Sequence, residues 1–453
     1  MKYIALTIGP IYKTLKNSKK TRELWGGSYI FSYIMKQIMK EFKTRTFITP
    51  YIDESMFESG KEVGLFHDRF IFASLEKDKE ELPKIIENVF SKLAENTSLS
   101  LDFLKAYFQI NFIEIDVKEN PIIETTPFLD SIEQFHNIGH YKENELVKML
   151  KGNNSFFTKE AFGEKKSFPS LPEIALYDLK EYINIKTLLK DDELEIFENK
   201  EIKKYLKPYH KYIAIVHADG DNMSEVIKDT SNLSKTSKSL FEYCTNSHNL
   251  IKKFGGQTIF AGGDDLLFFA PVVSNSKTIF ELLDEISQEF NSKFEEKASL
   301  SFGVSITYYK YPLYEALEKS RELLFSKAKQ QPKNNIAYEV VKHSGQTFIG
   351  IVNKGNKEAY ENFLSFVSIE KSLDDNFLHS LHHKINLHKK ILDTIKTDKL
   401  KLENFFENYF NEAGHKEYRE FFTKLIDYIM IEQNIENIYA TLRFIKFIKG
   451  DKK

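Results

Sequence analysis

The sequence predicts an α+β protein built from two ferredoxin-like domains, a small middle domain and a C-terminal helical domain. Three observations support this prediction. The element order strand, helix, strand, strand, helix, strand occurs twice, and both rounds begin with the tetrapeptide KYIA. After Ser344 the apolar residues follow a helical spacing to the end of the chain. We therefore expect domains at residues 1–118, 119–206, 207–345 and 346–453.

The first round of elements begins directly after Met1. In the segment KYIALTIG, Ile4, Leu6 and Ile8 alternate at period two, which is typical of a strand. A helix should follow at residues 28–42, and the glycine pair that precedes it leaves space where another group could approach the backbone closely. The other expected elements are strands at 46–50 and 68–74, a helix opened by Pro83 at 82–96, and a strand at 108–117.

The second round begins with the segment KYIAIVHADGD and repeats the same order. The expected elements are a strand at 211–221, a helix at 234–254, a hairpin at 257–271, a helix at 276–294, a strand at 298–309, a helix at 311–329 and a strand at 334–342. In the C-terminal region Leu378, Leu381, Ile385 and Leu392 mark one apolar stripe of a helix.

Composition excludes several classes of protein. Of 453 residues, 42% are hydrophobic, which is enough to bury large cores. Lys plus Arg (64) nearly balances Asp plus Glu (66), so no global positive charge indicates nucleic-acid binding. The single cysteine, Cys244, excludes a disulfide framework and a cysteine-rich zinc site. A strand-like N-terminus and the lack of an apolar run of about 18 residues lead us to expect a cytoplasmic protein without a membrane segment.

Two acidic motifs follow very apolar strands of the second round. The run IAIVHAD ends at Asp219, followed by Gly220 and Asp221. About 45 residues later, the sequence GGDD, residues 262–265, joins two apolar stretches at what reads as a tight hairpin. If the hairpin pairs beside the first strand, Asp219 meets Asp264 and Asp265 at one edge of the sheet. Gly262 and Gly263 have no side chains, so phosphate oxygens could come close to this turn.

Adjacent carboxylates repel one another unless a cation lies between them. Two divalent ions about 3.5 to 4 Å apart are the arrangement that catalyses in-line nucleotidyl transfer. Ligands that are all oxygen favour Mg²⁺ or Mn²⁺ over zinc. The alternative is that both motifs are ordinary turns, because Asp and Gly are common there. The co-occurrence of the two motifs at the ends of apolar strands favours the metal site.

Four segments carry a resemblance to a known family: HADGDNM, GGDD, residues 301–329 and residues 8–35. Together they resemble the palm-domain large subunit of type III-B CRISPR-Cas effector complexes. The resemblance covers most of the chain and is weakest from Lys118 to Leu206. It implies two ferredoxin-like palms that face each other around a nucleotide site. It also implies a ribonucleoprotein with other subunits, a guide RNA and a target RNA, acting in antiviral defence.

The resemblance implies a reaction and its residues. Recognition of target RNA is expected to switch on conversion of ATP to a second messenger, usually cyclic oligoadenylate. Asp264 and Asp265 would be the catalytic pair and would hold the two metal ions together with Asp219, with Asp221 as a further contributor. Lys329 is expected to meet a triphosphate, the alternative being a plain solvated lysine.

The sequence also departs from that family. Many members begin with an HD nuclease domain, whereas here the first predicted palm starts within the first few residues, so we expect no such nuclease. The dipeptide His67-Asp68 lacks neighbouring histidines and acids, and we assign it to hairpin structure. The first palm reads TIGP where the second reads HADGD, so it should be catalytically inert and form the opposite wall of the site. Without the zinc-binding cysteines often found between the palms, the middle domain must be held by its core alone.

Three alternatives remain open from the sequence. Some family members without the nuclease domain are thought to join AMP to S-adenosylmethionine, which uses the same metal chemistry with another acceptor. A structural subunit that has lost activity is the second, although the intact acids argue against it. A diguanylate cyclase is the third, and it is disfavoured because that family reads GG(D/E)EF, whereas here Leu266 follows Asp265.

Overall fold

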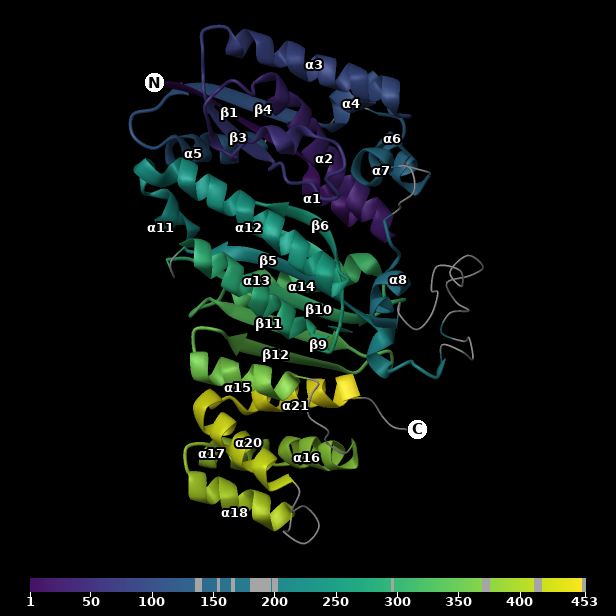
Figure 1. The fold of residues 1–453 in the computed structure, drawn as a ribbon, viewed down its shortest axis with the longest axis vertical. Coiled ribbons are helices and arrows are strands. Elements are labelled where there is room, and N and C mark those ends of the chain that lie inside the picture. Colours follow the sequence, from purple (N-terminus) through teal and green to yellow (C-terminus); the bar gives the residue numbers. More distant parts are fainter. Residues whose placement is uncertain are drawn as a thin grey trace.

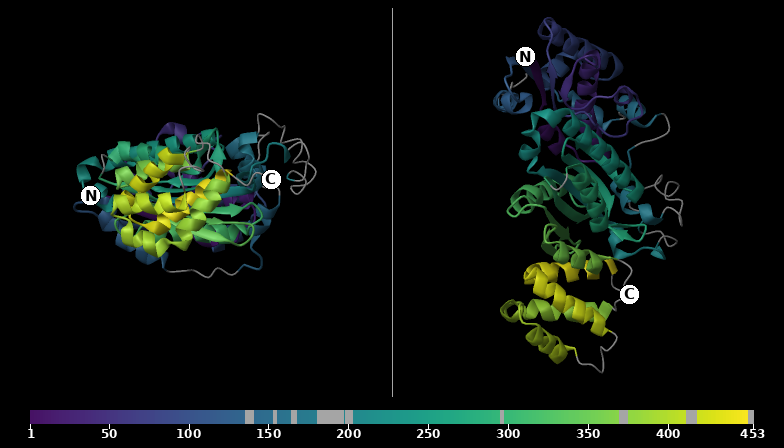
Figure 2. Two further views of the ribbon diagram at one scale, coloured as in Figure 1. Left: turned by 90° about the horizontal axis from the view of Figure 1, so that it is seen from below. Right: turned by 60° about the vertical axis from the view of Figure 1, so that its left-hand side comes forward.

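The computed structural model describes residues 1–134, 141–152, 155–163, 168–179, 197, 203–294, 297–368, 375–410 and 418–449. Two large β-sheets and a group of C-terminal helices follow one another along the long axis of the molecule (Figure 1). Views from two other directions show the same arrangement (Figure 2). The predicted α+β class, with two ferredoxin-like sheets and a C-terminal helical region, is confirmed.

The first sheet has the strand order β2-β3-β1-β4, and all neighbours in it are antiparallel. Its strands are β1 (Lys2–Gly9), β2 (Phe47–Thr49), β3 (Arg69–Ala73) and β4 (Gln109–Asp116). Helices α2 (Thr21–Glu41) and α3 (Asp78–Asn96) connect them as in a ferredoxin-like fold. Shorter helices at this end of the molecule are α1 (Ile11–Lys16), η1 (Glu54–Phe57) and α4 (Leu101–Tyr107).

Helix α2 begins seven residues before the predicted start at residue 28. The glycine pair, Gly26 and Gly27, therefore lies inside the helix and is buried there. A Cβ at Gly27 would come within 3.4 Å of Thr14 and 3.5 Å of Leu150, so the missing side chain admits two neighbouring helices. The close approach that we expected at this glycine pair is thus made by protein. Helix α3 also begins earlier than expected, at Asp78, and Pro83 lies inside it.

The second sheet contains the same four-strand pattern and two further strands. Its order is β12-β11-β10-β5-β7-β6, in which β10-β5-β7-β6 repeats the order of the first sheet. The strands are β5 (Tyr212–Asp221), β6 (Gln257–Gly262), β7 (Asp265–Pro271), β10 (Ser299–Tyr308), β11 (Asn335–Val341) and β12 (Thr347–Asn353). Between them lie α11 (Met223–Ile227), η4 (Thr230–Asn232), α12 (Leu233–Phe254), the small hairpin β8 (Val273–Ser274) and β9 (Lys277–Thr278), α13 (Ile279–Phe294), α14 (Leu313–Leu323) and η5 (Leu324–Ala328).

The two faces of the second sheet are covered by different helices. On one face Ala214 and Val216 of β5 pack with residues of α12 and α13. On the other face Ile213 and Ile215 share a core with α14 and with α2 of the first sheet's region. The first and second sheets are therefore joined by a continuous apolar core rather than by a linker.

The strand β12 was not predicted. We expected helix from about residue 346 onward, but Thr347–Asn353 pairs antiparallel with β11. The burial of this strand alternates between exposed and buried residues, as in an edge strand with one face on the core. The small β8–β9 hairpin was also missed.

In the part of the segment after residue 118 that the structure describes, most buried apolar residues join the core of the first palm, and Leu176, Leu179 and Phe197 form a small separate cluster with Tyr309. Helix α5 (Pro121–Glu133) packs on β1 and β4, and Arg69 of β3 forms ion pairs with Asp130 and Glu133 of this helix. The helices α6 (Glu145–Lys151), α7 (Ser155–Phe162) and α8 (Leu171–Ala175), with η2 (Tyr177–Leu179), follow, and apolar residues from α6, α7 and α8 belong to the same core as α2. The expectation of a separately held middle core was therefore wrong for these helices.

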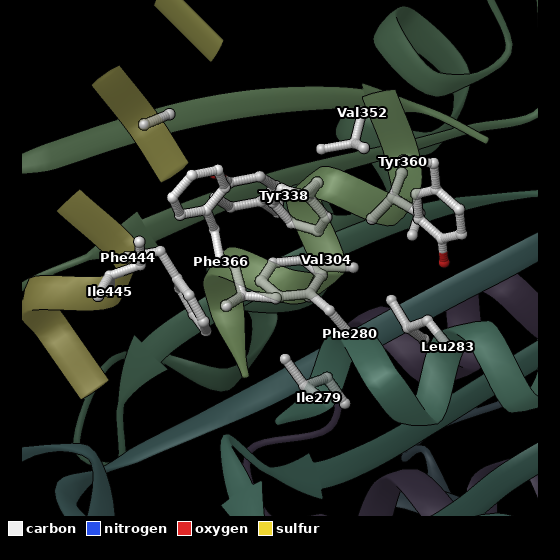
Figure 3. Packing of buried hydrophobic residues seen from close by; sticks show 14 of the residues in the cluster. Ile279, Phe280, Leu283, Val304, Tyr338, Val352, Tyr360, Phe366, Phe444 and Ile445 are labelled. Carbon is white, nitrogen blue, oxygen red and sulfur yellow. The ribbon is translucent and has the colours of Figure 1, made fainter. Parts of the chain in front are cut away.

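The C-terminal helices pack on β12 and on one another. They are α15 (Lys357–Val367), α16 (Asp375–Leu387), α17 (Lys389–Ile395), α18 (Lys399–Tyr409), α20 (Arg419–Glu432) and α21 (Ile435–Lys449), and η3 (Pro208–Lys211) leads into β5. Phe280 contacts Tyr338 and Phe444 at ring distances of 4.9 and 4.8 Å, which joins α13, β11 and α21 in one aromatic cluster (Figure 3). The predicted stripe is buried at Leu378, Leu381, Ile385 and Leu392. Among the described residues no helix is long and apolar enough to cross a membrane.

Candidate active site

The motif Asp219-Gly220-Asp221 occupies the end of β5, between β10 and β7. Side chains alternate along a strand, so Asp219 and Asp221 point to one face of the sheet and Gly220 lies on the other. Asp221 is fully buried, whereas the Asp219 side chain is 18% exposed. The motif therefore presents one accessible and one buried carboxylate on the same face.

Asp221 is fixed by three donors, two from β10 and one from the residue that precedes β11. Its Oδ2 accepts hydrogen bonds from Ser301 Oγ (2.7 Å), Ser299 Oγ (3.0 Å) and the backbone N–H of Asn334 (3.0 Å). Its Oδ1 is buried and has no hydrogen-bond partner among the residues that the structure describes. A buried carboxylate oxygen without a donor is costly, so this atom is a candidate for contact with a cation.

The GGDD sequence forms the predicted tight hairpin. Gly262 pairs with Asp265 across the end of β6 and β7, so Gly263 and Asp264 form a two-residue loop. Gly263 has a φ of +66°, a conformation that favours glycine. Because β7 is the direct neighbour of β5, with Ala218 opposite Leu266, the loop lies beside the end of β5. The predicted pairing of the hairpin with the first strand of this sheet is confirmed.

Asp264 packs directly on Gly220. A Cβ at position 220 would come within 2.5 Å of Asp264 Oδ2, so only glycine fits beneath this carboxylate. Burial raises the pKa of Asp264, the Asp221 carboxylate raises it further, and a hydrogen bond from the Gly220 N–H opposes both effects. Asp264 is thus placed on the opposite face of β5 from the side chains of Asp219 and Asp221.

Asp265 lies in a different environment from Asp264. Its side chain is accessible to solvent, yet the surrounding protein removes enough water to raise its pKa well above the usual value. The carboxylates of Asp264 and Asp68 add to this effect.

The ammonium of Lys329 lies among the acids of β5. Lys329 Nζ forms an ion pair with Asp219 Oδ2, donates a hydrogen bond to the carbonyl oxygen of Gly220 (2.7 Å) and lies 3.9 Å from Asp221 Oδ1. Burial, with a smaller effect of Lys333, lowers the pKa of Lys329 to about 8 in spite of these contacts. The alternative of a plain solvated lysine is therefore wrong.

Two side chains that the sequence analysis had not placed in the site contact the hairpin loop. The backbone N–H of Gly263 donates a hydrogen bond to His67 Nε2 (2.8 Å). On the other side of the same residue, Cys244 Sγ of α12 donates to the carbonyl oxygen of Gly263 (3.3 Å). His67 and Asp68 directly precede β3 of the first palm, as the assignment to hairpin structure expects, and in addition His67 contacts the GGDD loop and Asp68 raises the pKa of Asp265.

The structure brings the predicted residues close to one another but does not arrange them as a complete metal-binding site. Asp219, Asp221, Lys329 and, through Gly220, Asp264 converge at the end of β5. In the described part of the chain, no three His, Cys, Asp or Glu side chains are grouped so that they could hold a metal ion. This agrees with the placement of Asp264 on the opposite face of β5. Gly262 leaves room for the ring of Phe260, which a Cβ would meet at 2.6 Å.

Two family models match the chain. Residues 212–337 match the second palm domain of Cas10/Cmr2, and residues 3–99 match the N-terminal region of the CRISPR-associated protein Cmr2. The chain is 32% identical over 176 residues to the CRISPR system Cmr subunit Cmr2 of Pyrococcus furiosus, a match that covers 31% of this chain and 20% of that relative. The matched region therefore spans about a fifth of the length of the curated relative.

Solved structures share the fold. A chain of a type III-B Cmr-beta structure bound to cognate target RNA has a TM-score of 0.63 at 11% identity, covering 98% of this chain and 82% of that one. The apo state of Cmr-beta gives 0.57 at 11% identity, with 90% and 77% covered. A Csm1-Csm4 cassette in complex with cA4 gives 0.56 at 12% identity, with 99% and 69% covered.

The two sheets, with the hairpin loop of the second beside the acids of its first strand, have the architecture of two palm domains. The matched models agree with this: the N-terminal region is of the Cmr2 type, and the second sheet belongs to a Cas10/Cmr2 second palm domain. The resemblance drawn from the sequence is confirmed. The expected lack of an HD nuclease stays a prediction, as do the four domain boundaries.

Proposed function

We propose that this chain is the large subunit of a type III-B CRISPR-Cas antiviral ribonucleoprotein that contains a guide RNA and recognises a target RNA. Its second palm would be a metal-dependent nucleotidyltransferase that converts ATP into cyclic oligoadenylate when target RNA is recognised. The matches to the Cmr2 N-terminal model and to the Cas10/Cmr2 second palm model support the first part. Solved chains with the same fold include one in a target-RNA complex and others in cassettes with cA4, cA3 and pppApA.

One observation carries the enzymatic part of the proposal. The Asp264 carboxylate lies on Gly220, the residue between Asp219 and Asp221, so two acidic motifs from distant parts of the chain meet at one point. Burial and like charges raise the pKa of Asp264 and Asp265. Clustered acids with raised pKa values are typical of functional sites, because a purely structural turn gains nothing from their repulsion.

The residues present fit a divalent ion in their chemistry. All the candidate ligands are carboxylates, which suit Mg²⁺ or Mn²⁺. Asp221 Oδ1 is buried without a donor, and Asp219 already binds a cation, the ammonium of Lys329. Asp219 and Asp221 from β5 and Asp264 and Asp265 from the hairpin loop would hold the ions, which requires the loop carboxylates to turn toward Asp219 and Asp221 when the ions bind. When bound, they would lower the pKa of an attacking hydroxyl and neutralise the charge on a pyrophosphate leaving group.

The chain's own residues would orient the nucleotide. The hydrogen bonds from Ser299, Ser301 and Asn334 keep the Asp221 carboxylate in one orientation, which removes the cost of ordering it during the reaction. The spaces left by the missing side chains of Gly262 and Gly263 are occupied by the ring of Phe260 and by His67, so a phosphate would not approach the loop through these spaces. Lys329 would exchange its contact with Asp219 for a phosphate oxygen of ATP, since a triphosphate carries more negative charge than one carboxylate.

The test is product formation by the reconstituted complex. The complex with guide RNA is incubated with target RNA, ATP and Mg²⁺ or Mn²⁺, with and without S-adenosylmethionine, and products are resolved by mass spectrometry. We expect oligoadenylates that require target RNA. In the variant Asp264→Ala/Asp265→Ala we expect a loss of at least about 1,000-fold, because both ligand and charge are removed.

A matched control separates chemistry from assembly. Asp102→Asn replaces an exposed acid on α4, far along the chain from the site, and should leave product formation unchanged. Full activity of the double-alanine variant would show that the site is elsewhere. An S-adenosylmethionine-dependent product would replace the cyclic product in the proposal, and no product under any condition would favour a structural subunit.

A further inference from the structure

A loop of the first palm runs along the edge strand of the second sheet. Gly64 forms an isolated parallel bridge with Phe260 of β6. The backbone N–H of Ala261 lies 3.5 Å from the carbonyl oxygen of Gly64. This loop continues through His67 and Asp68 into β3. The hairpin of the second palm is thus bordered by chain that belongs to the first palm.

The loop ends with a specific contact to Gly263. His67 Nε2 accepts the hydrogen bond from the Gly263 N–H at 2.8 Å, and the imidazole packs so closely that a Cβ on Gly263 would lie 3.0 Å from His67 Cε1. The carbonyl oxygen of the same glycine accepts from Cys244 Sγ. Both polar backbone atoms of Gly263 are therefore bound by side chains, one from each palm.

The contact requires one protonation state of His67. A ring nitrogen that accepts a hydrogen bond carries no proton, so the proton of the neutral ring is on Nδ1. Burial lowers the pKa of His67 to about 4, which keeps the ring neutral near pH 7. The groups that surround the turn are acids, Asp68, Asp264 and Asp265, and the nearby Cys244 thiol.

The contact lies directly before the two acids. Gly263 is the first residue of the two-residue loop and Asp264 the second, followed by Asp265 at the start of β7. The hydrogen bond of such a turn joins the flanking residues and leaves the N–H of the first loop residue free, so an external acceptor on this N–H adds a restraint on the peptide that leads into Asp264. A displacement of about 1 Å at such a position can reduce a rate by about 100-fold.

We propose that His67 is a positioning residue: it holds the Gly263 peptide from the first palm and thereby sets the geometry of Asp264 and Asp265 in the second. The proposal rests on the proposed nucleotidyltransferase function for its kinetic consequence, but the contact itself can be tested without activity. The first palm, which we expect to be catalytically inert, would then contribute a hydrogen-bond acceptor to the site in addition to forming its opposite wall.

Three variants of the full chain test this role. His67→Phe keeps a ring but removes the acceptor, and His67→Gln restores an acceptor oxygen. His248→Phe is the matched control, because His248 bonds Thr258 Oγ1 of β6 (3.0 Å) and does not touch the loop. Hydrogen–deuterium exchange of the peptide covering the loop is measured on the free chain, and kcat and KM for ATP on the reconstituted complex.

We expect faster exchange at the loop and a kcat about tenfold lower for His67→Phe, with KM for ATP within about twofold. For His67→Gln we expect both properties close to those of the unmodified protein, and no change for His248→Phe. Unchanged loop exchange in His67→Phe would overturn the contact. Equal losses of kcat in His67→Phe and His67→Gln would show that His67 acts only by filling space and not as a hydrogen-bond acceptor. An inactive unmodified complex with the predicted exchange pattern would contradict the proposed function and leave the positioning contact intact.

Discussion

The two palms share a strand order but differ at the ends of their central strands. In the first sheet β1 lies between β3 and β4, and in the second β5 lies between β7 and β10. The glycine that ends β1, Gly9, has no atom within 4 Å of where its Cβ would be, whereas Gly220 of β5 is covered by Asp264. The same scaffold thus ends in open space in one copy and in packed carboxylates in the other.

The hairpin loops show the same contrast. The second palm has the GGDD loop before β7, and the first has His67 and Asp68 before β3. These two residues contact or act on the second palm's loop rather than forming a site of their own. A palm without the acidic motif therefore still supplies a contact to the loop that carries this motif in the other palm.

We expect the largest effect on product formation from a substitution at Gly220, because the end of β5 differs most from the end of β1 at this residue. Gly220→Ala forces a Cβ to 2.5 Å from Asp264 Oδ2 and 2.8 Å from Met223, so the Asp264 carboxylate must move. We expect product formation to fall by about 100-fold. The measurement is the rate of product formation by the reconstituted complex, with thermal melting to check the fold.

The first palm supplies the control for that change. Gly9→Ala adds the same atom at the end of β1, where nothing lies within 4 Å. Its rate should stay within about twofold of the unmodified protein. Equal losses in the two variants would remove the distinction between the strand ends.

A smaller effect is expected when the ammonium group of Lys329 is removed from the second palm. Lys329→Met removes the ammonium from Asp219 and from the carbonyl oxygen of Gly220. Because this ammonium competes with a divalent ion for Asp219, we expect Mn²⁺ to bind the free chain about tenfold more tightly, while KM for ATP rises. Electron paramagnetic resonance titration with Mn²⁺ gives the affinity directly.

The nearby Lys327 provides a matched lysine for this test, since it lies on the same turn (η5) two residues away. Lys327→Met should bind Mn²⁺ as the unmodified chain does. Unchanged or weaker Mn²⁺ binding in Lys329→Met would show that Asp219 is not an ion ligand.

The smallest effect concerns Lys354, a buried lysine close enough to Asp221 for the two side chains to interact electrostatically. Lys354 is 8% exposed, and its Nζ donates hydrogen bonds to Ser287 Oγ (2.8 Å) and to the carbonyl oxygen of Leu300 (2.7 Å). Burial lowers the pKa of Lys354 to about 7, although Asp221 and Asp284 oppose the shift. An unfolded lysine titrates near about 10.4, so between these values the unfolded state binds more protons and stability rises with pH.

Urea unfolding at pH 7, 8 and 9 measures this dependence. The Lys354→Met variant should lose a contribution of up to about 1.4 kcal/mol per pH unit to the free energy of unfolding. Lys228→Met, which replaces an exposed lysine on the surface, should keep it. Parallel pH profiles for all three proteins would contradict a buried, neutral Lys354.

Local patterns were enough to predict much of the fold and the meeting of the two acidic motifs. Alternating apolar residues predicted β1 and β5, and the order of elements predicted that β7 would pair with β5, which places Asp264 beside Gly220. The strand β12 was missed because its apolar residues alternate over one short segment next to long helical patterns. The shared core of α6, α7 and α8 with α2 was missed because sequence periodicity does not say which apolar faces will meet.

The chemistry at the end of β5 can be read from the residues alone: which of them are acids, where glycines replace side chains, and which strands carry them. Three contacts become visible only in the folded chain: Asp264 covers Gly220 on one face of β5, Lys329 binds Asp219 on the other, and His67 reaches Gly263 across 196 residues of chain. Spacing along a strand specifies only the local direction of side chains. Contacts between segments far apart in the chain depend instead on how whole faces pack, and many distant residues contribute to that packing.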